Sequence, residues 1–182
     1  MRLAPALLAV LALAACREEV AAIPDPVPMT AEAVGHYCQM DLLEHPGPKA
    51  QVHLDGAPGM PLFFSQVRDA VAYQRMPEQS HAITAIYVSD MARAASWEDP
   101  GAENWVRADL AHYVVGAAVP GGMGAPELVP FSTPEAAAAF TARHGGMVLP
   151  LAAIADEDVL APVEMAVDEN GDFIAPAGAT DH

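Results

Sequence analysis

The apolar residues in the first half of the chain form short runs whose spacing changes from strand-like to helix-like and back. Residues 50–54 and 61–64 are short apolar runs, and residues 82–88 alternate β-branched and aromatic side chains, so all three are predicted as strands. Residues 65–76 carry apolar side chains at helical spacing, namely Val67, Ala70, Val71 and Tyr73. This order predicts a strand–strand–helix–strand unit within residues 36–90.

The second half of the chain repeats this order. Residues 112–119 and 127–131 are rich in β-branched and other apolar side chains, which predicts two further strands. A helix is predicted over residues 134–143 and a closing strand over residues 147–151. These elements define a second predicted ββαβ unit within residues 111–155.

The two predicted units are weakly related in sequence. The start of the second helix is marked by Ser132 or Thr133 as the N-cap and by Pro134 in the first turn. Aligning the Phe-Ser pair at residue 64 with the pair at residue 131 also aligns small and aromatic helix residues. These are Ala70, Ala72 and Tyr73, opposite Ala137, Ala139 and Phe140. We therefore predict an α+β fold with two related ββαβ units.

Three other segments have compositions that do not favour a packed core. Residues 16–35 contain three closely spaced prolines and little apolar periodicity, which predicts a flexible N-terminal tether. Residues 91–110 are polar, with a turn at residues 99–101, and are predicted as the connection between the units. Residues 156–182 contain eight acidic residues and no Lys or Arg, which predicts a largely disordered acidic tail.

The N-terminus has the pattern of an export signal. Arg2 precedes an apolar run that is too short to span a bilayer, and small residues then lead to Cys16. The tetrad Leu13-Ala14-Ala15-Cys16 resembles a bacterial lipobox, so residues 1–15 are predicted to be removed and Cys16 to carry lipid. Arg17, rather than Asp, after this cysteine resembles lipoproteins that are sent to the outer membrane.

The chain is strongly acidic, with a formal net charge of −16 at pH 7 and Lys49 as its one lysine. A surface of this sign would repel the phosphates of nucleic acids and the headgroups of anionic lipids. Nucleic-acid binding is therefore excluded, and attachment to a membrane is assigned to the lipid on Cys16.

Cys38 has no cysteine partner if Cys16 is acylated. An unpaired thiol is prone to oxidation in an exported protein, so a specific role is expected for it. Met40 is two residues away, and in an extended backbone the two side chains would point to the same side. A thiolate with a thioether selects Cu(I) over Zn(II), Ca(II) or Mg(II). The alternative is a buried cysteine packed beside a core methionine. The polar neighbours Gln39 and Asp41 favour the ligand pair.

Two irregular segments complete the candidate chemistry. Residues 45–51, His-Pro-Gly-Pro-Lys-Ala-Gln, predict a rigid turn that leads into a strand, because two prolines fix the backbone on either side of a glycine. Residues 119–131 embed Met123 among glycines, where it has little to pack against locally. Such a loop allows the backbone to approach another segment closely.

These motifs together resemble the NosL family of nitrous oxide reductase accessory lipoproteins. The resemblance rests on the lipobox, the Cys38-Gln39-Met40 segment, residues 45–51 and residues 122–131, and it covers residues 16–149 approximately. It implies a periplasm-facing lipoprotein with two ββαβ units that binds one Cu(I) ion and helps to supply copper to nitrous oxide reductase. It also implies a partner, the ATP-driven Nos transporter complex.

The resemblance further implies that Cys38, Met40 and Met123 are the Cu(I) ligands. Copper would then join segments more than eighty residues apart, one from each unit, and act as a clasp between them. An imidazole from His45 or His36 competes with Met123 for the third position. The other four histidines of residues 50–150 are interpreted as structural or surface residues, namely His53, His81, His112 and His144.

Two other classes of protein stay open at this point, a thiol-dependent enzyme and a structural lipoprotein without a metal. Nucleophilic catalysis needs a base held beside the thiol and a third group that orients the base. His36 and Asp41 are near Cys38 in sequence, but no catalytic signature surrounds them. We therefore predict no catalytic residue.

Overall fold

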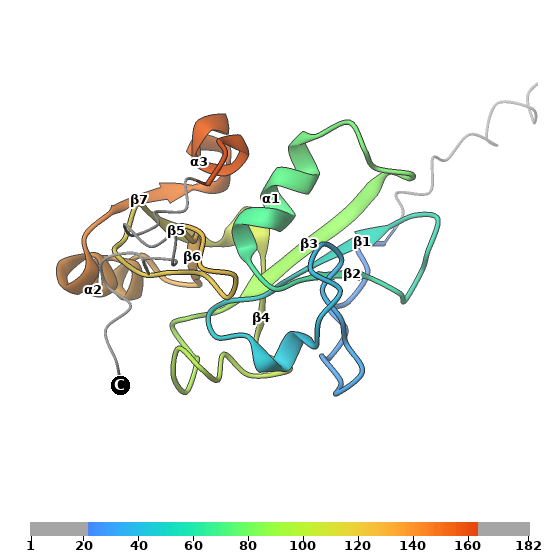
Figure 1. Ribbon diagram of the computed structural model, residues 1–182, viewed down its shortest axis with the longest axis horizontal. Helices are drawn as coiled ribbons and strands as arrows, with labels where there is room; N and C mark the ends of the chain where they lie inside the picture. The colour runs from blue at the N-terminus through green and yellow to red at the C-terminus, as the bar shows by residue number, and fades with distance from the viewer. Residues whose placement is uncertain (1–21, 164–182) are drawn as a thin grey trace, which may run out of the picture.

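The computed structural model describes residues 22–163, so the predicted signal sequence, Cys16 and most of the acidic tail lie outside the described residues. Within this range the chain has a mixed α+β fold with two antiparallel sheets, each carrying a helix (Figure 1). The predicted α+β class is confirmed. No helix in the described part of the chain is long and apolar enough to cross a membrane.

Among residues 22–163, the first sheet has four strands in the order β2-β1-β3-β4. Strand β1 (Ala50–Leu54) is central and pairs antiparallel with β2 (Leu62–Phe64) and β3 (Ile83–Ser89). Helix α1 (Val67–Arg75) connects β2 with β3 and packs on the sheet with its buried face. The register places Ala50 opposite Phe64 on one side and Val88 on the other.

The second sheet has three strands in the order β6-β5-β7 within the described residues. Strand β5 (His112–Val115) is central and pairs with β6 (Val129–Phe131) and β7 (Met147–Pro150). Helix α2 (Pro134–His144) connects β6 with β7, and its N-cap is Thr133. The register places His112 opposite Phe131 and Pro150.

The two units therefore share one strand order and also one aromatic contact. In the first unit, the rings of Phe64 and Tyr73 have centroids 5.5 Å apart and planes inclined by 48°. In the second unit, Phe131 and Phe140 occupy the aligned positions, with ring centroids 5.3 Å apart and planes inclined by 50°. In both units this pair joins the end of the second strand to the helix. A common origin of the two units stays a prediction.

The two units share a core. Tyr113 on β5 is fully buried among residues of β1, β3 and α1, whereas its neighbour Val114 packs with α2. Successive residues of a strand face opposite sides, so α2 covers one face of the second sheet and the first unit covers the other. Apolar packing therefore joins the units, although few contacts between them were evident from the sequence, and a copper clasp between them stays a prediction.

The described part of the predicted tether packs along the first sheet. The side chain of Gln51 exchanges two hydrogen bonds with the main chain of Val27, at 2.8 and 2.9 Å. The Tyr87 hydroxyl donates to the carbonyl of Pro24 at 2.7 Å, and Met29 is buried. Proline prevents a helix here but leaves the extended main chain free to donate and accept these hydrogen bonds. A free tether is therefore wrong for this part.

The predicted connection also contributes to the first sheet. Strand β4 (Trp105–Arg107) pairs antiparallel with β3 and becomes an edge strand, and the 3₁₀ helix η2 (Ala108–Leu110) follows it. A run of three residues is too short to show a strand period in a polar segment. This is why the sequence pattern indicated an irregular connection.

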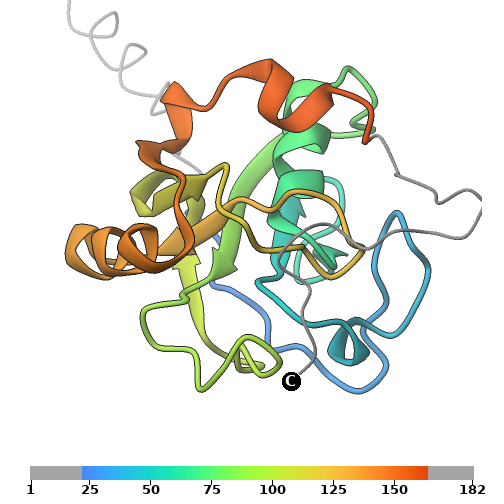
Figure 2. The same cartoon turned by 60° about the vertical axis from the view of Figure 1, so that its left-hand side comes forward.

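The first residues of the predicted acidic tail form a helix rather than a disordered segment. After the 3₁₀ helix η3 (Leu151–Ala153), helix α3 (Asp156–Leu160) lies against α1 in both overall views (Figures 1 and 2). Val159 is buried in the shared core. The prediction that disorder begins at residue 156 is therefore wrong, and the tail beyond residue 163 lies outside the described residues.

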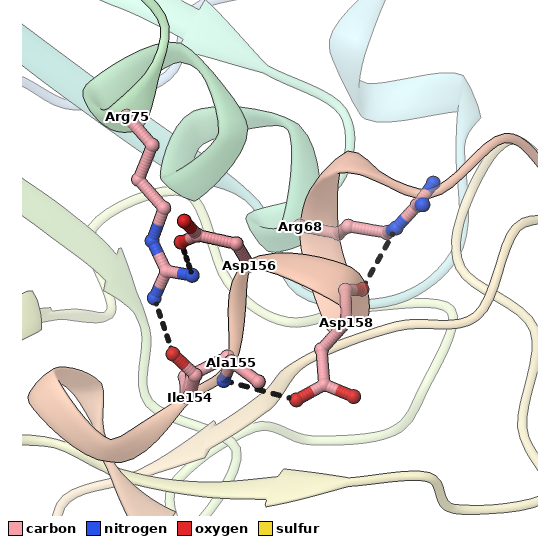
Figure 3. Close-up of polar contacts among 6 residues, drawn as sticks. All are labelled: Arg68, Arg75, Ile154, Ala155, Asp156 and Asp158. Carbon is pink, nitrogen blue, oxygen red and sulfur yellow. Dashed lines mark hydrogen bonds and ion pairs between the residues drawn. The ribbon is translucent and has the colours of Figure 1, made fainter.

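Two arginines of α1 hold α3 in place, as Figure 3 shows. Arg75 forms an ion pair with Asp156 at 2.8 Å and donates to the carbonyl of Ile154 at 2.8 Å. Arg68 donates to the carbonyls of Asp158 at 3.1 Å and Ala161 at 2.6 Å. The acidic segment has no basic residue of its own, so α1 supplies the positive charge.

Candidate functional site

Cys38 and Met40 lie in a tight turn before the 3₁₀ helix η1 (Leu42–Glu44). The Gly35 N–H donates to the Met40 carbonyl at 3.0 Å, and the Gln39 N–H donates to the Gly35 carbonyl at 2.8 Å. Gln39 has a φ of 56°, in the left-handed region. The predicted extended geometry is therefore wrong, and strand alternation does not set the directions of the two sulfur side chains.

The two residues before Cys38 attach this turn to the first unit. The His36 N–H donates to the carbonyl of Phe63 on β2 at 2.6 Å. The Tyr37 hydroxyl donates to the Glu78 carboxylate, which lies just beyond α1. The backbone that carries the thiol is thus attached to a sheet edge and to the end of a helix.

Both sulfur side chains of the turn are accessible. Cys38 is a free, half-buried thiol, and Met40 is 42% exposed. The thiol folds back over Gly35, where an added Cβ atom would lie only 2.4 Å from Sγ, so a larger residue would displace it. A soft donor pair is therefore presented near the surface on a fixed backbone.

Met123 lies in the loop between β5 and β6, which extends from the second sheet to the first unit (Figure 2). The Met123 N–H donates to Oε1 of Gln66 at 2.9 Å. An added Cβ on Gly121 would lie 2.6 Å from that same Oε1, and one on Gly122 would lie 2.8 Å from a main-chain oxygen of the first unit. The glycines permit the close approach that the sequence predicted, and the Met123 side chain stays 43% exposed.

The turn and the loop meet at the main chain of Ser65, immediately before α1. A Cβ atom on Gly35, next to the Cys38 thiol, would lie 3.8 Å from the Ser65 nitrogen. A Cβ atom on Gly122, next to Met123, would lie 3.0 Å from the Ser65 oxygen. The structure therefore brings the segments of all three predicted ligands to one end of α1.

His45 reaches the same loop from the first unit. Its Nδ1 atom lies 3.2 Å from the Gly122 carbonyl oxygen, and because a carbonyl only accepts, the ring proton sits on Nδ1. Its Nε2 atom is buried and has no hydrogen-bond partner among residues 22–163. Histidines that bind metals commonly donate one ring N–H to a carbonyl and ligate through the other nitrogen. His45 thus has the form of a ligand.

Two buried ionisable residues lie behind the loop. Lys49 is 1% exposed and donates to the carbonyls of Pro46 and Gly47. Burial lowers the pKa of its ammonium group to about 8, although the attraction of Glu127 and of Cys38 raises it. Glu127 is 2% exposed, and burial raises the pKa of its carboxyl group to about 8. A positive charge on Lys49 therefore faces both the thiol and the carboxyl group.

The remaining predicted alternatives have other surroundings. The His36 ring packs against Phe64 and Tyr73, with centroids 5.5 and 5.6 Å away. His53 is buried beside Gln51, and burial lowers the pKa of its imidazole. Among residues 22–163, no group of three or more His, Cys, Asp or Glu side chains could hold a metal ion.

The sequence analysis missed three residues that shape this site, namely Gln66, Lys49 and Glu127. Gln66 stands where a helix N-cap is expected, although glutamine is a poor N-cap residue. Lys49 is the one lysine of an acidic chain and lies in the Pro-Gly-Pro-Lys turn, which could have marked it as buried and functional. No sequence signal identified Glu127, because the backbone N–H of Arg68 that it accepts from lies in the other unit.

Comparison with known proteins places these residues in a family context. The NosL family profile matches residues 26–159. A copper-binding lipoprotein NosL of Achromobacter cycloclastes is 59% identical over 161 residues, which cover 88% of this chain and 83% of that protein. A copper-binding lipoprotein NosL of Stutzerimonas stutzeri is 35% identical over 134 residues, which cover 73% of this chain and 67% of that protein.

A solved structure shows the same fold. The crystal structure of the copper chaperone NosL from Shewanella denitrificans superposes with a TM-score of 0.67 at 27% sequence identity. The match covers 72% of this chain and 96% of that chain. The arrangement of the two units is thus shared over nearly the whole of that relative.

Proposed function

The chain belongs to the NosL family, and from this premise we propose that it is a lipid-anchored copper chaperone that carries one Cu(I) ion for the assembly of nitrous oxide reductase. The observation that supports this most strongly is the meeting of the Cys38 turn and the Met123 loop at Ser65. Two soft-donor segments from different units thus lie next to the same residue.

The proposed ligands are the Cys38 thiolate and the thioethers of Met40 and Met123. Sulfur donors of this kind select Cu(I), and a d¹⁰ ion accepts a site with three ligands. The thiol must lose its proton to bind, so Cu(I) binding should release a proton and weaken as the pH falls. The thioethers add no charge, so Cys38 dominates the affinity.

His45 is the alternative to Met123 as the third ligand. The unpartnered, buried Nε2 atom and the contact of Nδ1 with Gly122 both favour it. Met123 is favoured by its exposed side chain, which has no competing role in the core. Substitution of each residue separates the two possibilities, because the loss of Cu(I) affinity should follow the true ligand.

A carrier has to release its cargo, and the exposure of the site suits this task. Met40 and Met123 are both more than two-fifths exposed, so a partner's ligands can approach the ion from outside. The proposed partners are nitrous oxide reductase and its ATP-driven Nos transporter complex. The role there is that of a carrier without catalysis, which rests on membership of a family of copper-binding lipoproteins.

The proposed location is the periplasmic face of a membrane, with the lipid on Cys16 as the anchor. The net charge of −16 offers no attraction to anionic lipid. The outer membrane is proposed on the ground that Arg17, rather than Asp, follows the lipidated cysteine.

A competitive Cu(I) titration against a chromophoric chelator tests the function. We expect one Cu(I) per chain, and a loss of affinity for Cys38→Ala larger than the roughly 10–100-fold cost of removing an outer-shell partner. Met60→Ala is the matched control, because Met60 is an exposed methionine of the first unit that lies outside the proposed site. Unchanged affinity for Cys38→Ala would refute the proposed function.

A further inference from the structure

Gln66 occupies the N-cap position of α1 but does not cap that helix. Its backbone is extended, and its side chain makes no capping hydrogen bond, although the residue is only 2% exposed. The aligned residue of the second unit is Thr133, whose side chain accepts from the Ala136 N–H and caps α2 in the ordinary way. The two units therefore differ at this position, although a side-chain N-cap is expected in both helices.

The side chain of Gln66 is directed at the glycine loop instead. Its Oε1 accepts the Met123 N–H at 2.9 Å, and its Nε2 donates to the Asp69 carboxylate at 3.2 Å. Because a carboxylate only accepts, Asp69 fixes which end of the Gln66 amide faces the loop. The acceptor is therefore held in position for Met123 before any metal binds.

The cap that α1 lacks comes from the second unit. Oε1 of Glu127 accepts the Arg68 N–H at 3.0 Å and the Leu128 N–H at 2.8 Å. An added Cβ on Gly121 would lie 2.6 Å from Gln66 Oε1 and 2.8 Å from Glu127 Oε2, so the loop passes closely over both side chains. Glu127 thus takes over the capping role, which leaves Gln66 available to the loop.

We propose that Gln66 is a positioning residue for copper binding, which holds the main chain of Met123 so that its thioether faces the ion. This proposal rests on the proposed function. The Met123 side chain is 43% exposed and so has little packing to orient it. A ligand on a loop is pre-organised only if its backbone is fixed, and the hydrogen bond from Met123 to Gln66 fixes it at the residue itself.

A double-mutant cycle on the full chain tests this role with Cu(I) as the probe. Gln66→Leu keeps the size of the side chain and removes the acceptor, so Cu(I) binding should weaken about fivefold, as expected for one neutral hydrogen bond. In the Met123→Ala background the same change should alter Cu(I) affinity less than about twofold, because the ligand that Gln66 positions is gone. An equal loss in both backgrounds would overturn the proposal.

Two further variants separate positioning from stability. Gln66→Thr introduces the residue type found at the aligned position 133, and a threonine there can cap α1. Cu(I) affinity should therefore fall while the melting temperature is kept. This variant also serves as the test if Gln66→Leu does not fold. Thr133→Ala is the matched control, which should lower the melting temperature and leave Cu(I) affinity unchanged. Unchanged Cu(I) affinity in both Gln66 variants would refute the positioning role. Absence of Cu(I) binding by the unsubstituted chain would instead refute the proposed function.

Discussion

Replacing Glu127 by glutamine should change how the stability of the protein depends on pH. The Glu127 carboxyl group accepts two backbone N–H groups through Oε1, while Oε2 is buried without a hydrogen-bond partner among the described residues. Burial raises the pKa of this carboxyl group to about 8. The two backbone hydrogen bonds and the attraction of Lys49 lower the pKa, but burial has the larger effect. The folded protein therefore holds a proton that the unfolded chain releases near pH 4.5.

The sign and size of the effect follow from this difference. Between about pH 4.5 and pH 8 the folded state binds one more proton than the unfolded state, so the free energy of unfolding falls as pH rises through this window. The difference in the pKa of Glu127 between the unfolded and the folded state corresponds to up to about 5 kcal/mol of unfolding free energy, at roughly 1.4 kcal/mol per pKa unit. Glutamine keeps the shape and the acceptor but cannot titrate, so its variant should lack this decline.

The assay is urea unfolding of both proteins at pH 5, 6 and 7, where Lys49 is charged in both states. The stability of Glu127→Gln relative to the unsubstituted protein should increase steadily with pH. Glu135→Gln is the control, because Glu135 is exposed in the first turn of α2. Parallel pH profiles for Glu127→Gln and the unsubstituted protein would refute the argument, since they would mean that Glu127 is ionised in the folded state.

The other predictions concern the C-terminal helix and the anchor. Arg68→Ala should cost about 2–3 kcal/mol of unfolding free energy, because it removes two charge-assisted hydrogen bonds to α3, and thermal unfolding measures this. Asp156→Ala should cost under about 1 kcal/mol in the same assay, because its ion pair with Arg75 is largely exposed; equal losses would contradict the assignment. Cys16→Ser should release the exported protein from the membrane fraction, and a variant that stays firmly bound would contradict the lipid anchor.

Much of the fold could be predicted because its signals are local. Strand β1 matches its predicted residues, and α2 begins at Pro134 as its capping sequence indicated. The elements that were missed depend on distant partners. Helix α3 is held by arginines about eighty and ninety residues earlier in the chain, and Gln51 holds the proline-rich segment that was predicted to be free.

The candidate site divides in the same way. Its candidate donors are predictions from the sequence, Cys38 and Met40 from their chemistry and Met123 as the third ligand that the family resemblance implies. Their geometry could not be derived, since the turn at Gln39 uses a left-handed backbone that residues other than glycine seldom adopt. The roles of Gln66 and Glu127 arise only where the two units meet, and no spacing within one unit encodes that contact.

The central claim is that one Cu(I) ion is bound by Cys38, Met40 and Met123, and copper K-edge X-ray absorption of the loaded protein tests it most directly. We expect a shell of three sulfur atoms that falls to two in Met123→Ala and is unchanged in His45→Ala. A shell with a nitrogen atom that disappears in His45→Ala, while Met123→Ala leaves it intact, would contradict the proposed ligand set.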